Sequence, residues 1–178
     1  MHGSGSLCSG PMSAESPSPQ AALRPIQMVS AMVGIGSVMI TIVRIFVDPS
    51  APLPALPAIA IVLVALIGAA VLIRFVGYSV PPLPPGLSPE HAASASLRQY
   101  TSNTSLRTAI AETPVLVAFA VSFAFQPHTW LPLLIALPGA LALWWLHAWP
   151  SPRTAAALER VLEANGAESH LRETLGLR

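Results

Sequence analysis

The hydrophobic positions of this chain gather in four long stretches that polar residues scarcely interrupt. They run from Ile26 to Val47, from about Pro57 to Tyr78, from about Leu106 to Phe125 and from Leu131 to Trp149. A stretch of about 18 or more apolar residues is long enough to cross a bilayer as a helix. Strand-like alternation is absent from these stretches, and a helix satisfies its own backbone hydrogen bonds in lipid. The pattern therefore predicts an all-α membrane protein with four transmembrane helices.

Short proline-bearing turns join the stretches in pairs. Residues 48–52 connect the first two and residues 126–129 connect the last two. Each pair is therefore expected to fold as an antiparallel hairpin. Placing Pro49 on Pro127 aligns the two turns and all four stretches, which suggests a duplicated hairpin. Chance similarity between apolar segments explains the same alignment.

These features divide the chain into five predicted segments. They are a disordered N-terminal tail (1–23), a transmembrane hairpin (24–78), a proline-rich cytoplasmic linker (79–105), a second transmembrane hairpin (106–150) and a cytoplasmic helical tail (151–178).

Two serine–proline pairs mark expected helix starts. Ser88-Pro89 predicts a short helix inside the linker, and Ser151-Pro152 predicts the start of a tail helix. Apolar residues recur on one face of that tail, so we expect an amphipathic helix that lies on the membrane or covers the bundle end. Residues 153–178 are also a candidate docking segment for a protein partner, and a homo-oligomer is an alternative.

The arginines are distributed unevenly between the two predicted sides of the membrane. Four spans place eight of the nine basic residues, all of them Arg, on the side of both termini and leave Arg44 on the other. Cytoplasmic loops carry the excess of positive charge, so both termini are predicted to face the cytoplasm. Composition rich in Arg, Ala and Pro is associated with bacterial genomes, which points to a bacterial inner membrane.

Composition excludes several other classes of function. The chain has 178 residues, of which 53% are hydrophobic and 10% charged, with a net charge of +1. This balance argues against nucleic-acid binding, which needs a basic surface. The single cysteine, Cys8, leaves no disulfide framework or Cys-based metal site. Neither a metal-ligand spacing nor a nucleophile paired with a base is recognisable, so we expect no cofactor and no enzymatic activity.

Glu112 is the only acidic residue well inside a predicted span. Ionisable groups inside a membrane are expensive and usually face the bundle interior or a water-filled cavity. Glu112 is therefore a candidate for proton transfer or cation binding, with Arg107, Arg74 and His147 as candidate partners. A structural hydrogen-bonding role is the alternative. Arg44, near the other end of the first span, is expected to snorkel and to pair with Asp48.

Tryptophans mark both ends of the fourth stretch. Trp130 precedes it, and Trp144, Trp145 and Trp149 close it. Tryptophan is enriched at membrane–water interfaces, so these four residues are predicted to be interfacial anchors.

The segment Ala111-Glu112-Thr113-Pro114-Val115-Leu116-Val117-Ala118-Phe119 resembles small, uncharacterised bacterial four-helix membrane proteins. Those proteins are in turn weakly similar to the double-hairpin proteolipid (c subunit) of rotary ATPases. The carboxylate of that family binds the transported ion, and the resemblance implies at most a protonatable role for Glu112. The sequence itself favours an integral inner-membrane protein with a structural or accessory role, and a proton- or ion-handling subunit using Glu112 is the alternative.

Overall fold

The computed structural model describes residues 19–177, and its regular segments are all helical. They are α1 (Pro19–Val47), α2 (Leu56–Phe75), α3 (Pro89–Ala124), α4 (Leu131–Leu143), the π-helical turn η1 (Trp144–Ala148), α5 (Pro152–Leu162) and α6 (Leu171–Leu175). Four helices, counting α4 with η1 as one, are long and apolar enough to cross a membrane, as the hydrophobic pattern predicts. The expected N-terminal tail lies outside the described residues except for 19–23, which begin α1.

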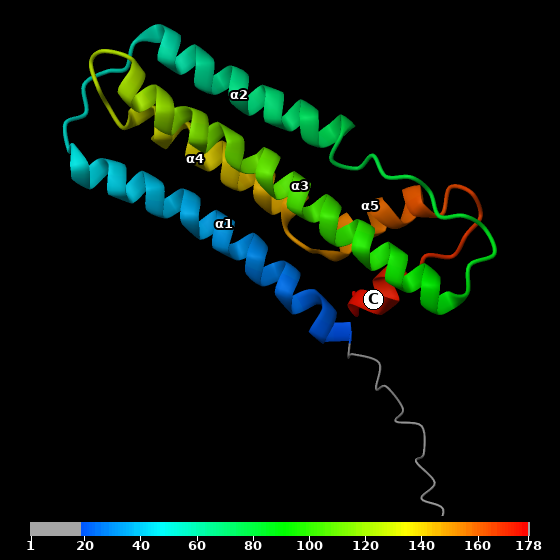
Figure 1. Cartoon of the computed structure of the whole chain (residues 1–178). Coiled ribbons are helices and arrows are strands. Elements are labelled where there is room, and N and C mark those ends of the chain that lie inside the picture. The colour runs from blue at the N-terminus through cyan, green and yellow to red at the C-terminus, as the bar shows by residue number, and fades with distance from the viewer. Residues whose placement is uncertain (1–18, 178) are drawn as a thin grey trace, which may run out of the picture.

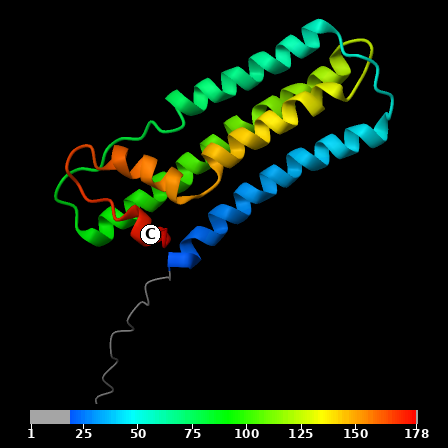
Figure 2. The same ribbon diagram turned by 180° about the vertical axis from the view of Figure 1, so that it is seen from behind.

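The long helices run side by side, with α3 and α4 between α1 and α2 (Figure 1). α3 packs against all three other long helices, whereas α1 and α2 hardly touch each other. The turn at residues 48–55 thus joins two helices that the α3–α4 pair separates, as the reverse view also shows (Figure 2). The two halves of the chain therefore differ in their packing, although their turns align in sequence.

α3 is a single helix that runs through most of the predicted linker into the third apolar stretch. Ser88 caps it by accepting a hydrogen bond from the His91 backbone N–H, and Pro89 occupies its first turn. The prediction of a separate short helix was wrong, because no glycine or proline follows before Pro114. At the helical rise α3 is about 54 Å long, well beyond the hydrocarbon thickness of about 30 Å. Its N-terminal half therefore projects past the apolar part of the bundle.

The chain builds two separate hydrophobic cores. The first lies at the projecting end and contains Ile26, Leu83, Ala92, Tyr100, Ala155, Leu158, Leu162, Leu171 and Leu175. The second lies between α2, α3 and α4 and contains Val62, Val115, Ala118, Leu133, Ala136 and Ala140. α1 contributes to the first core but not to the second, and hydrogen bonds at Ser30 and Arg44 join it to α3 and η1.

α5 and α6 cover one end of the bundle. α5 starts where Ser151-Pro152 predicts, with a capping box between Ser151 and Thr154. Its leucines enter the first core, and the Leu83 N–H donates to the Leu162 carbonyl at 2.9 Å, which fixes the proline-rich segment to α5. α6 packs against the start of α1, so both ends of the described chain lie together (Figure 1).

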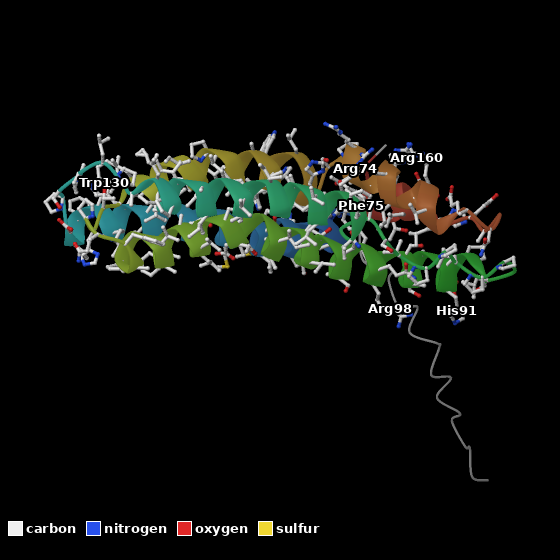
Figure 3. All side chains as sticks on the ribbon, turned by 90° about the horizontal axis from the view of Figure 1, so that it is seen from above. Arg74, Phe75, His91, Arg98, Trp130 and Arg160 are labelled. Atoms are coloured by element: carbon white, nitrogen blue, oxygen red, sulfur yellow. The ribbon has the colours of Figure 1, made fainter. Side chains whose placement is uncertain are left out.

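The polarity of the bundle is the reverse of that of a water-soluble protein. Large apolar side chains point outward along all four long helices, among them Val64 at 69% and Phe75 at 74% exposure. Serines, threonines, Arg44 and Arg107 are buried instead. Arg74, Arg98 and Arg160 lie toward the end that carries α5, while Trp130 lies at the far end (Figure 3). Outward apolar faces of this extent are typical of helices that cross a membrane.

Candidate functional site

Glu112 lies on the part of α3 that faces α1, where the two helices leave a groove of about 560 Å³. We call this space the α1–α3 groove. It is lined by Pro25, Ile26, Val29, Ser30 and Val33 of α1 and by Leu97, Thr101, Thr104, Ser105, Thr108, Ala109 and Glu112 of α3. The carboxyl group of Glu112 is half-buried at the end of the groove that lies deepest in the apolar bundle.

Glu112 has no hydrogen-bond or ion-pair partner among residues 19–177. A carboxyl group that served to tie two helices together would need such a partner across the interface. The geometry thus favours a carboxyl group that is open to a ligand over one with a purely structural role.

Trp144 lies beside the inner end of the groove, where it contacts Ser30. Its indole Nε1 donates to both the carbonyl oxygen and the hydroxyl of Ser30, each at 3.0 Å. A second space of about 10 Å³, lined by Gly34, Glu112 and Trp144 among others, lies beside this contact. That volume is near the minimum that holds one water. At Glu112 the wide part of the groove therefore gives way to this much smaller space.

Arg107 is fully buried and lies away from Glu112. Five positions separate the two residues, which turns their side chains by about 140° around the helix. The Arg107 Nε donates to the Asn103 carbonyl at 3.3 Å, and Nη2 donates to the Thr104 hydroxyl at 3.2 Å. The guanidinium also lies 4.6 Å from the centre of the Tyr78 ring. No described carboxylate lies within ion-pair distance of it, so the structure does not pair this candidate partner with Glu112.

His147 joins Arg107 through Tyr78 rather than reaching Glu112. Its Nδ1 lies 3.3 Å from the Tyr78 hydroxyl, and the two rings meet edge to face. The sequence analysis did not single out Tyr78 as a partner of Arg107 and His147. The neighbouring Gly77 was the one local feature that could have indicated a close helix contact there. A Cβ on Gly77 would lie 2.9 Å from the Arg107 Cγ, so the glycine permits this close approach.

Arg44 was predicted to snorkel toward the interface, and this was wrong because it is 2% exposed. Its Nε and Nη2 donate to the hydroxyl and carbonyl of Ser122 at 3.2 and 3.3 Å, and it lies over the Phe123 ring. The expected pair with Asp48 is present at 3.8 Å. Arg44 therefore fastens the far end of α1 to α3.

The four predicted anchors divide between the two ends of α4 and η1. Trp130 is the residue before α4, and its Nε1 is buried without a hydrogen-bond partner. At the other end Trp145 and Trp149 stack at 5.6 Å, and Trp145 is 60% exposed. Trp144 turns inward to α1, so its contacts are those of a helix-packing residue.

No group of three or more His, Cys, Asp or Glu that could hold a metal ion occurs within residues 19–177. Comparisons with protein-family models, curated proteins and solved structures found no match. The function therefore has to be argued from the site itself, in which the unpartnered Glu112 carboxyl is the most unusual group.

Proposed function

We propose that this chain is an integral protein of a bacterial inner membrane and that it acts as a non-enzymatic accessory component. The outward apolar faces of α1, α2, α4 and the second half of α3 support the assignment to a membrane. The excess of arginine at the end that carries α5 supports a cytoplasmic location for that end and for both termini.

In this topology the four spans form two antiparallel pairs in chain order, with the turns at 48–55 and 125–130 outside the cell. The first half of α3, α5 and α6 form a cytoplasmic cap. The apolar side of the tail is occupied within the cap, so a protein partner of residues 153–178 would meet its charged side. A homo-oligomer would instead use the lipid-facing helices.

The role we assign within this membrane protein is proton or cation binding by Glu112. One observation carries the assignment: the carboxyl group borders an open groove and has no partner among the described residues. Burying an unpaired carboxylate in an apolar setting is costly, so the group takes up a proton or a positively charged ligand.

Carbodiimide labelling tests the assignment, because these reagents modify protonated carboxyl groups. In native membranes dicyclohexylcarbodiimide, which partitions into lipid, should modify Glu112 and leave Glu90 unmodified. Glu90 is a matched control in the exposed first turn of α3. A water-soluble carbodiimide should show the opposite preference, and Glu112→Gln should abolish the lipid-phase product. Peptide mass spectrometry locates the modification.

Absence of lipid-phase labelling at Glu112 in folded protein would refute the assignment. Equal labelling of Glu90 and Glu112 by the water-soluble reagent would also refute it, since both carboxyl groups would then lie in bulk water.

A further inference from the structure

The size of the α1–α3 groove indicates a ligand larger than an ion. Its volume of about 560 Å³ far exceeds the roughly 30 Å³ that one water occupies in the liquid. Small-molecule pockets of proteins typically measure about 300–1,000 Å³. On α3 the lining extends from Leu97 to Glu112, or about 22 Å at the helical rise. The space is therefore elongated and suits a narrow molecule.

Three of the five hydroxyl groups that line the groove present oxygen lone pairs rather than protons. Thr101 donates to the Leu97 carbonyl at 2.9 Å, Ser105 to the Thr101 carbonyl at 3.1 Å, and Thr108 to the Thr104 carbonyl at 2.9 Å. Each hydroxyl has one proton to give, so these three retain only their capacity to accept. A ligand that supplies N–H donors is thus matched along this wall.

The charge of the groove points the same way. Among residues 19–177, Glu112 is the only ionisable residue that lines it, and no arginine or histidine from this part of the chain does so. An anionic headgroup would find no cationic partner here, whereas an ammonium group would neutralise the carboxylate. Ile26, Val29 and Val33 supply an apolar wall opposite the hydroxyls.

We propose that the α1–α3 groove binds a lipophilic cation with N–H donors, such as an alkylammonium, with its charged group at Glu112. This inference rests on the proposed cation-binding role of Glu112. The apolar body of the ligand lies along the α1 wall, and the N–H groups reach the Glu112 carboxylate and the hydroxyl nearest to it, that of Thr108. An acyl chain of a bilayer lipid is the competing occupant, and it would make no use of the carboxylate.

The test uses the full chain in lipid nanodiscs with decylammonium as the probe. Protection of Glu112 from dicyclohexylcarbodiimide and calorimetric titration against empty nanodiscs both report binding. Decanol, decanoate and decyltrimethylammonium are matched ligands that lack the charge, reverse it or lack the N–H groups. We expect decylammonium to bind at least about tenfold more tightly than each of them, because a hydrogen bond to a charged group contributes that much.

Two variants test separately the contributions of the Glu112 carboxylate and of the open volume of the groove to binding. Glu112→Gln should weaken decylammonium binding at least about tenfold by removing the charged acceptor. Ala109→Trp should block the groove while leaving Glu112 in place, and Ala120→Trp, on an exposed part of α3 outside the groove, should bind like wild type.

Equal binding of decanol and decylammonium, or binding that survives both Glu112→Gln and Ala109→Trp, would overturn the proposal in favour of an acyl chain. Labelling of Glu112 without protection by decylammonium would overturn this inference alone and leave the proton-binding role intact. Failure of Glu112 to label at all would refute the proposed function on which the inference rests.

Discussion

Replacing Gly77 with alanine tests the junction that holds α2 to α3. A Cβ at this position would lie 2.5 Å from the Ile73 carbonyl oxygen and 2.9 Å from the Arg107 Cγ. The first atom belongs to the last turn of α2 and the second to a fully buried side chain, so neither can withdraw freely. Overpacking typically costs about 1–3 kcal/mol. Because both neighbours are constrained, we expect Gly77→Ala to lose about 3 kcal/mol of unfolding free energy.

Gly68→Ala, inside α2, is the control for a glycine-to-alanine change. Nothing lies within 4 Å of a Cβ at Gly68, and alanine in a helix interior is favoured over glycine by about 0.5–1 kcal/mol. Thermal unfolding in one detergent should place Gly77→Ala about 6–12 °C below wild type and Gly68→Ala at or above it. Unfolding temperatures for the two variants that coincide would refute the close approach of Gly77 to Arg107.

Three further outcomes are expected. The unfolding free energy of Arg107→Met in denaturant should stay within about 1 kcal/mol of the wild-type value. Arg107→Ala should lose about 3 kcal/mol of unfolding free energy, because it leaves a cavity. Equal losses in the two variants would contradict this reasoning. Trp144→Phe should lose about 1 kcal/mol relative to Trp145→Phe in the same assay, because only the first removes a hydrogen bond to α1. Hydrogen bonds from the Ser50 hydroxyl and N–H lower the pKa of Asp48 below its usual value of 3.8. The small stabilisation that Asp48 provides is therefore complete above pH 3.8 and lost on further acidification, so wild type and Asp48→Asn should converge in an acid titration of stability.

The long helices could be predicted from sequence because lipid imposes a simple rule on a spanning segment. An apolar run long enough to cross a membrane favours a helix, and each of the four predicted stretches falls on one long helix of the structure. The starts of α3 and α5 were also predictable, since Ser88 and Ser151 each precede a proline and cap a helix locally.

The length of α3 was not predictable from hydropathy, because its first half is polar. Packing against α5 and α6 stabilises that half. The hydroxyl groups of Ser96, Thr101 and Ser105 hydrogen-bond within the helix, so a stretch that resembles a linker in composition remains helical. Tertiary packing decides such segments more than residue propensity does.

The surroundings of Glu112 required the three-dimensional arrangement. Sequence marked the carboxylate as unusual, but its expected partners Arg107 and His147 meet Tyr78 on another face of α3. Which helix faces which depends on the rotation of α3 and on α1 packing against α3 rather than against α2. The local pattern of apolar residues determines neither the rotation of α3 nor the helix against which α1 packs.

The central claim is that lipid surrounds the middle of the bundle while the cap lies in water. Spin labels on Val64→Cys of α2 and His91→Cys of α3, with Cys8 replaced by serine, test it by their collision rates with oxygen and with a water-soluble nickel complex. Both positions are exposed in the structure. The account predicts that the label at residue 64 favours oxygen and the label at residue 91 favours nickel. Equal access of nickel to both labels would contradict it.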